Sequence, residues 1–355
     1  MQSKKISVPP RSREDYQLIG GAGDSAVDRG LVNAHWYKSP VSRPQMKQLM
    51  QRSDLPAIKD TCIWYACLGL AAAALVWTWG TPWAWLAFFA YGTLYGGPAD
   101  SRWHEAGHGT AFKTRWMNDA LYQVASFQVL RRPTVWRWSH ARHHTDTLVT
   151  GRDPEIAALL PIDVPGMLLN LFAIRSGPRE LWRALWNASG HISDAEKTFI
   201  PEMEWPQVIR DARKWVSLYA VLITSAVIIK SFLPLVLIGL LPGMMGTWLY
   251  TFFGLTQHAG LPENVTDFRE NCRTVYMNPV FRFLYWNMNF HLEHHMYPMV
   301  PYHALPALHE TIKADCPPPY TSTLQAYREI LPTLWRQAYD PEYFVNRPVP
   351  KGETE

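Results

Sequence analysis

The stretch TCIWYACLGLAAAALVWTW, residues 61 to 79, contains no charged side chain. It is followed by the turn-forming residues Gly80, Thr81 and Pro82, and then by a second apolar stretch, WAWLAFFAYGTLYGG, at residues 83 to 97. About 20 consecutive apolar residues are enough for a helix to cross the hydrocarbon core of a bilayer. These residues therefore predict two membrane-spanning helices joined by a tight turn.

A second apolar block predicts another hairpin, with one span over residues 215 to 230 and the other over residues 232 to 254. The shorter spans only just fit a core of ~30 Å, so we expect their helices to continue beyond the bilayer. Together the two blocks predict an all-α membrane protein with four transmembrane helices in two hairpins. Residues 1 to 57 form a polar N-terminal segment, and residues 58 to 355 form a single predicted membrane domain.

Lysine and arginine near the span ends indicate the orientation, because these residues collect on the cytosolic side of a membrane. The turn at residues 80 to 82 has neither, and the second turn has only Lys230. The opposite ends of the spans carry Lys59, Arg102, Lys113, Arg213 and Lys214. We therefore expect both termini and a helical cap that includes residues 98 to 213 to lie in the cytosol, against a bacterial inner membrane. The net charge of +4 suits contact with anionic lipids and requires no nucleic-acid partner.

Most of the 13 histidines lie outside the predicted spans, either within a few residues of a span end or in the segments that follow the spans. They form the motifs HEAGH at residues 104 to 108, HARHH at 140 to 144 and HLEHH at 291 to 295, and His258 follows the fourth span. Histidines three or four positions apart lie on one face of a helix, so each motif can present several imidazoles together. The other histidines are expected to be ordinary surface or half-buried residues: His35, His191, His303 and His309.

Nine clustered imidazoles are more than one tetrahedral zinc site with three or four protein ligands can use. Adjacent histidines in the HxxHH motifs can point toward different ions, which favours two metals. Imidazole binds Fe, Cu, Zn and Ni, and we favour iron because an all-nitrogen site with open positions suits oxygen activation. Nearby carboxylates are candidates to orient the rings from a second layer: Glu105, Asp146, Asp153, Glu155 and Glu293.

The four cysteines, Cys62, Cys67, Cys272 and Cys316, show no metal-binding spacing and are expected to be free thiols. The chain contains no HPGG segment of a haem-binding cytochrome domain and no CxxC pair of an iron–sulfur centre. If the histidine site carries out redox chemistry, its electrons must therefore come from a separate protein.

The chain resembles the membrane fatty acid desaturase and hydroxylase superfamily over roughly residues 60 to 315. The resemblance rests on the three histidine motifs in their order, together with the placement of the apolar hairpins, whereas one motif alone would be weak evidence. The run HHMYPMVPYHALPALHE, from His294, is similar to the family's continuation after its third motif. One position departs, because Gly254 stands where some acyl-CoA desaturases have an asparagine four positions before the extra histidine. The water-mediated asparagine contact of those enzymes is therefore not carried over.

The resemblance implies a nonhaem di-iron centre at the membrane surface, which uses O2 and two electrons to break an unactivated C–H bond. The most direct expectation is a fatty acyl or lipid desaturase. The resemblance names no catalytic residue beyond the iron ligands. By motif, these ligands are His104, His108, His140, His143, His144, His258, His291, His294 and His295.

The same resemblance suggests how substrate and electrons arrive. We expect a lipid or acyl chain to enter an apolar slot from the bilayer and to bend beneath the metals, with the second and fourth spans setting its depth. Three basic residues are candidates to hold a phosphate or carboxylate headgroup, the other interpretation being a solvated basic patch: Arg131, Arg132 and Arg137. The implied electron donor is a ferredoxin, for example of Rieske type, or a small cytochrome with its reductase.

Two other functions stay open on the sequence. A hydroxylase or oxidative demethylase of the same superfamily, acting on a lipid or a small organic molecule, would share every motif because the reactions diverge only after the first hydrogen is removed. A membrane metal transporter or metal sensor would also concentrate histidines. Transport pathways place ionisable residues inside the spans, however, and these spans contain almost none.

Overall fold

The computed structural model describes residues 11–350 and is built from helices, with no strand in that range beyond three isolated bridges. The longer helices are α3 (Asp54–Thr78), α4 (Ala84–Gly107), α5 (Arg115–Gln128), α6 (Pro133–Thr145), α8 (Ser176–Ala188), α10 (Trp205–Ile228), α12 (Leu240–His258) and α17 (Thr323–Gln337). The shorter ones are η1 (Arg13–Tyr16), α1 (Gly21–Asp28), α2 (Arg43–Leu49), α7 (Val164–Asn170), α9 (Asp194–Lys197), η2 (Glu202–Glu204), α11 (Leu233–Leu237), α13 (Phe268–Asn271), α14 (Pro279–Leu284), α15 (His291–Met296), α16 (Leu305–Ile312) and η3 (Lys313–Asp315).

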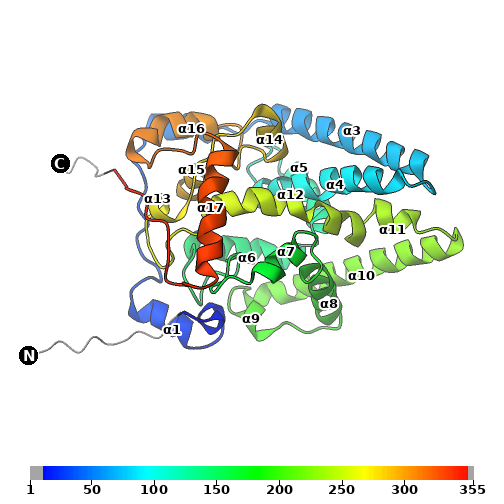
Figure 1. Ribbon diagram of the computed structural model, residues 1–355, viewed down its shortest axis with the longest axis horizontal. Coiled ribbons are helices and arrows are strands. Elements are labelled where there is room, and N and C mark those ends of the chain that lie inside the picture. The colour runs from blue at the N-terminus through cyan, green and yellow to red at the C-terminus, as the bar shows by residue number, and fades with distance from the viewer. Residues whose placement is uncertain (1–10, 351–355) are drawn as a thin grey trace, which may run out of the picture.

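The two predicted hairpins are present as helical hairpins. α3 and α4 are joined around Gly80, whose φ of +84° is a conformation that residues with a side chain rarely adopt. α10 turns around Lys230 into α11. Figure 1 shows that α3, α4, α10 and α11 extend to one end of the molecule, whereas both chain ends lie at the other. As expected, α3, α4 and α10 also continue past the apolar stretches toward the polar end.

The fourth predicted span, residues 232 to 254, is two helices instead of one. α11 ends at Leu237 and α12 begins at Leu240. Gly239 between them has a φ of +90°, and a side-chain carbon there would lie 2.9 Å from the ring of Tyr219. A left-handed residue cannot continue a right-handed helix, so this glycine breaks the segment where apolar composition alone predicts continuity.

Two helical segments are long and apolar enough to cross a membrane, Arg43–Thr78 and Leu233–His258. α4 and α10 are less apolar than these two segments. α4 is rich in Gly, Trp and Tyr, and the first half of α10 carries charged residues. The outer ends of all these helices nevertheless expose large apolar side chains: Leu70, Val76, Trp77, Trp85, Leu86, Val221, Val227, Ile228 and Phe232. Exposed apolar side chains gathered at one end of a molecule mark a membrane or protein contact.

Glycines bring α4 and α12 into close contact. A side-chain carbon added at Gly96 would lie 2.9 Å from the Gly243 carbonyl oxygen and 3.1 Å from the Gly246 Cα. One added at Gly97 would lie 2.6 Å from the Leu249 side chain. Small residues let two helix backbones approach closely, as in many membrane helix pairs. The contact leaves no room between α4 and α12 at this level.

The two terminal segments both attach to the loop that follows α12. The Tyr16 hydroxyl donates a hydrogen bond of 2.9 Å to Glu263, and the Tyr37 amide donates one of 3.0 Å to the Thr266 carbonyl. From the other end of the chain, the Val345 amide donates one of 2.9 Å to the Gly260 carbonyl. The described part of the polar N-terminal segment is therefore packed onto the domain, next to the histidine-bearing end of α12.

Candidate metal centre

The ends of four helices carry the nine motif histidines to one place. His104 lies in the last turn of α4, and His108 is the residue that ends it. His140, His143 and His144 share α6, and His258 is the last residue of α12. α15 supplies the final three, His291, His294 and His295. The structure thus brings together every histidine that the sequence singled out and leaves His35, His191, His303 and His309 outside the groups.

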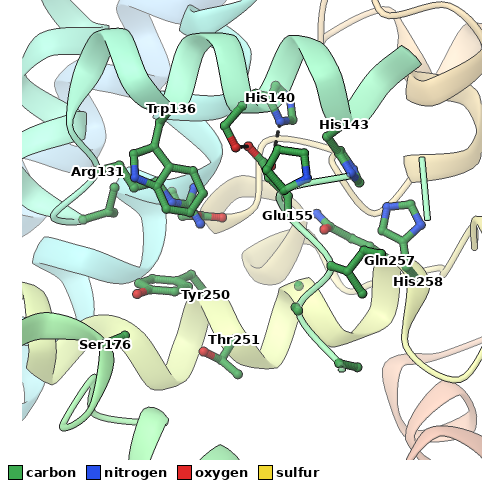
Figure 2. Close-up of a pocket in the computed structure, with 18 of the residues that line it drawn as sticks. Arg131, Trp136, His140, His143, Glu155, Ser176, Tyr250, Thr251, Gln257 and His258 are labelled. Atoms are coloured by element: carbon green, nitrogen blue, oxygen red, sulfur yellow. Dashed lines mark hydrogen bonds and ion pairs between the residues drawn. The ribbon is translucent and has the colours of Figure 1, made fainter. Parts of the chain in front are cut away.

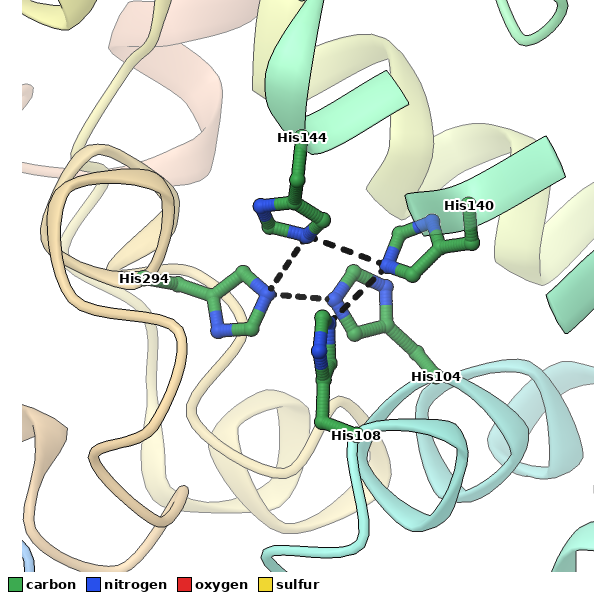
Figure 3. Close-up of side chains that lie close together, drawn as sticks. All are labelled: His104, His108, His140, His144 and His294. Carbon is green, nitrogen blue, oxygen red and sulfur yellow. Dashed lines mark hydrogen bonds between the residues drawn. The ribbon is translucent and has the colours of Figure 1, made fainter. Parts of the chain in front are cut away.

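Five of these histidines form one cluster, hereafter the first cluster: His104, His108, His140, His144 and His294. Figure 3 shows their rings pointing toward one another from α4, α6 and α15. The Nε2 atoms of His104 and His294 lie 2.7 Å apart, and those of His108 and His140 lie 3.1 Å apart. The Nε2 atom of His144 lies 3.1 Å from that of His140 and 3.3 Å from that of His294.

The other four form the second cluster: His143, His258, His291 and His295. The Nε2 atom of His291 lies 2.9 Å from that of His258 and 3.0 Å from that of His295. In both clusters all the facing ligand atoms lie within 4.8 Å of one another. Neighbours in the chain are divided between the clusters, since His143 and His144 belong to different ones, as do His294 and His295.

The donor set fits one metal ion in each cluster. Two nitrogens that each lie about 2.1 Å from one ion at a right angle are about 3.0 Å apart, which matches the Nε2 separations. Burial, followed by the neighbouring imidazoles, lowers the pKa of six rings well below the ordinary value: His104, His108, His144, His291, His294 and His295. These rings are therefore neutral at physiological pH, and neutral imidazole is the form that binds metals.

Hydrogen bonds on the far side of the rings orient several of them. Nδ1 of His140 lies 3.0 Å from Glu155, and Nδ1 of His143 lies 2.8 Å from Asp153. Burial raises the pKa of Glu155, but His140, His143 and Arg131 together lower it to about 2, so this carboxylate stays charged. Such partners fix which nitrogen carries the proton and leave Nε2 free to bind an ion.

Two further hydrogen-bond partners of the histidine rings could not be predicted from the sequence. Nδ1 of His258 lies 2.8 Å from the Asn271 backbone carbonyl, and Nδ1 of His295 lies 3.2 Å from the Thr147 hydroxyl. A backbone carbonyl is available at every residue, so composition cannot mark it. Thr147 follows the HARHH motif closely, but only the packing of α15 against that loop gives it a ring to contact.

The other candidate carboxylates contact groups outside the two clusters. Glu105 accepts a 3.0 Å hydrogen bond from the Tyr302 amide, and burial raises its pKa to about 7. Asp146 pairs with Arg142 and Arg152. Glu293 lies 2.5 Å from Nδ1 of His309 and accepts a 2.7 Å hydrogen bond from Thr274. His309 is thus a buried structural partner of α15.

A cavity of about 570 Å³, within the usual range for small-molecule sites, reaches both clusters. Its wall includes His104 and His140 of the first cluster and His143, His258 and His291 of the second. Figure 2 shows Trp136 and Arg131 at one end of this space and His258 at the other. Tyr250 and Thr251 of α12 lie across it from Trp136 and Glu155.

The three arginines proposed to hold a headgroup have different surroundings. Arg131 lines the cavity and pairs with Asp100 at 2.5 Å. Arg132 is buried and paired with Glu180 at 3.3 Å and also with Glu196. Arg137 has a side chain 46% exposed and lies 3.5 Å from Asp119. The predicted free thiols are confirmed, because all four cysteines are unpaired.

The chain belongs to the fatty acid desaturase family, whose model matches residues 80–327. The match includes all nine clustered histidines, α4 of the first hairpin and the whole second hairpin, whereas α3 precedes it. It confirms the resemblance that the three motifs indicated. No curated protein is similar enough to be matched. The family identifies the protein as an oxidoreductase of a membrane-associated class, with histidine clusters able to bind metal.

Proposed function

We propose that this protein is an O2-dependent di-iron oxidase that removes hydrogen from an unactivated C–H bond. The observation that carries the proposal is the convergence of nine imidazoles into two adjacent clusters, with Nε2 separations of 2.7 to 3.3 Å. Family membership supports an oxidoreductase, and neutral imidazole ligands with unfilled positions suit iron used for oxygen activation.

The first cluster would hold one ion and the second cluster the other. A bound iron pair would supply the oxidising power, drawn from O2 and two electrons, that breaks the C–H bond. The chain's own groups set the geometry. Glu155 and Asp153 keep a proton on Nδ1 of His140 and His143, and the cavity wall places the substrate beside both clusters.

Desaturation of a fatty acyl or lipid chain is the first candidate reaction, supported by the family. It consumes O2, two electrons and two protons, and it yields a carbon–carbon double bond and two molecules of water. Hydroxylation or oxidative demethylation of a small organic molecule is the second candidate. The polar and charged residues along the cavity wall, among them Arg131, Glu155 and Glu180, favour it.

The proposal includes a membrane arrangement and a partner. α3, α4, α10 and the α11–α12 segment would form four spans, with the histidine end and both termini in the cytosol as a helical cap. The exposed apolar ends of these helices support this arrangement. A separate ferredoxin, for example of Rieske type, or a small cytochrome with its reductase would deliver electrons, since the sequence has no cofactor motif of its own for this task.

Metal content and product mass test the proposal together. The isolated protein should hold two iron ions per chain, and His294→Ala and His143→Ala should each lose metal and activity. His191→Ala changes an exposed histidine outside the clusters and should keep both. With an electron donor present, a product lighter by two hydrogens identifies desaturation, and one heavier by an oxygen or lacking a methyl group identifies the second candidate. Full metal content in both cluster variants would refute the ligand assignment.

A further inference from the structure

The cavity does not continue between the helices toward their apolar ends. α4 contributes Asp100, Trp103 and His104, all near its polar end, and α12 contributes Tyr250 and the residues that follow it. Among the described residues, α3, α10 and α11 contribute none. Below the cavity, Gly96 and Gly97 of α4 pack directly on α12. The expected acyl slot between the second and fourth spans is therefore closed, and an extended hydrocarbon chain has no apolar channel there.

Toward α8 the wall of the cavity is charged. It carries Arg132, Arg179, Glu180, Arg183 and Glu196. A hydrocarbon chain laid along these residues would desolvate charged groups without replacing their hydrogen bonds. This side of the cavity therefore favours a molecule short enough to stay beside the clusters.

One cation faces this space with unused donors. The Arg131 guanidinium lies 4.1 Å from the ring centre of Trp103, 4.8 Å from that of Trp136 and 5.6 Å from that of Tyr250. Asp100 is its single acidic partner in the described part of the chain. A guanidinium carries five N–H donors in a planar fork that matches a carboxylate. The three rings and Asp100 hold the fork in place, and its other donors remain available to a ligand.

Trp103 is close to both Arg131 and the first cluster, because its ring centre lies 4.1 Å from the Arg131 guanidinium and 5.5 Å from the ring centre of His140. An anionic group bound to Arg131 would therefore lie only a short molecule's length from the metals.

We propose, building on the proposed function, that the substrate is a compact organic anion whose carboxylate-like group binds Arg131 while a nearby carbon faces the two clusters. Gly254 then has a specific role. It lies on α12 between Tyr250 and His258 at helical spacing and lines the cavity, and a side-chain carbon there would meet no atom within 4 Å. Its missing side chain leaves the space in which the reacting part of the molecule lies.

Ligand binding to the isolated, iron-loaded protein tests this inference without turnover. Thermal melting is followed while sodium butyrate, sodium laurate or butylammonium chloride is added. Butyrate should raise the melting temperature in a saturable way, with laurate and butylammonium clearly weaker. The double variant Asp100→Asn, Arg131→Gln removes both charges together. It should weaken the binding of butyrate by at least about tenfold. Arg210→Gln, at an exposed arginine that does not line the cavity, should leave butyrate binding unchanged.

Gly254→Leu gives an independent test, because Gly254 lines the cavity and a Cβ added there would meet no atom within 4 Å. It should abolish butyrate binding and keep the melting temperature of the free protein, and Gly254→Ala should have a smaller effect. The inference would be overturned if laurate or butylammonium bound more strongly than butyrate, or if butyrate showed no saturable binding. Full butyrate affinity in Gly254→Leu would also overturn it. Iron content measured on the same samples separates this outcome from a failure of the di-iron proposal.

Discussion

Asp153 connects the surroundings of the two clusters through one buried side chain. Its Oδ2 atom accepts hydrogen bonds of 2.8 Å from His143 Nδ1 and from the Leu148 amide, and its Oδ1 atom accepts one of 2.8 Å from the Glu155 amide. Glu155 in turn lies 3.0 Å from Nδ1 of His140 in the other cluster. A single carboxylate therefore orients one ring directly and helps to position the partner of another.

Asp153→Asn should weaken metal binding about 10- to 100-fold, the usual cost of losing a carboxylate behind a ligating histidine. An amide keeps the size of the side chain but lacks the charge and one acceptor atom. Competition with a chelator measures the loss. Asp146→Asn is the matched control, because Asp146 is equally buried in the same loop but pairs with arginines instead of a histidine. Equal losses in the two variants would contradict this role.

The difference between these two aspartates could not be read from the sequence. Glu105, Asp146, Asp153, Glu155 and Glu293 all lie close to a histidine motif. The position of each carboxylate around its helix, or the path of its loop, decides which group it contacts. Glu293 contacts His309, whereas Glu155 contacts His140. The histidines themselves were predictable because their spacing places several rings on one helix face.

At the scale of helices, the glycines between α4 and α12 hold the ligand-bearing ends at a fixed separation. Gly246→Ala should lower stability by about 1–3 kcal/mol, since the added carbon would lie 2.6 Å from the Gly96 Cα and backbone atoms cannot move aside. The melting temperature in detergent measures the effect. Iron occupancy should fall as well, because His104 and His258 end these two helices.

Gly69→Ala serves as the control within a helix of the same kind. Gly69 lies on α3 with no atom within 4 Å of an added carbon, so alanine should be neutral or stabilising by up to about 1 kcal/mol. If both substitutions changed the melting temperature alike, close packing at the α4–α12 contact would not be the cause.

For the whole molecule, the proposed arrangement places the hairpin turns and the histidine end on opposite sides of a membrane. Cysteines introduced by Thr81→Cys and Lys230→Cys, at exposed turn positions, should react with a membrane-impermeant maleimide added outside intact cells. A cysteine from Asp194→Cys, also exposed, should react only after the cells are opened. Labelling of all three positions from the same side would exclude four spans.

The sequence predicted the helical class, both hairpins and the histidine set, because each depends on local periodicity. It did not predict the break at Gly239, where the backbone adopts a φ of +90° and a side-chain carbon would meet Tyr219. Nor did it predict the closed α4–α12 contact or the box of Trp103, Trp136 and Tyr250 around Arg131. These features join residues from separate helices, and their distances arise only when the helices pack.

The division of neighbouring histidines between the clusters has an evolutionary consequence. α6 and α15 each contribute to both clusters, so one inserted or deleted residue inside either helix would rotate the following rings by about 100° and remove ligands from both sites at once. The two clusters are therefore coupled through α6 and α15, and a change in the length of either helix affects both clusters together. We expect changes in chain length during divergence to fall in the connecting loops and the terminal segments.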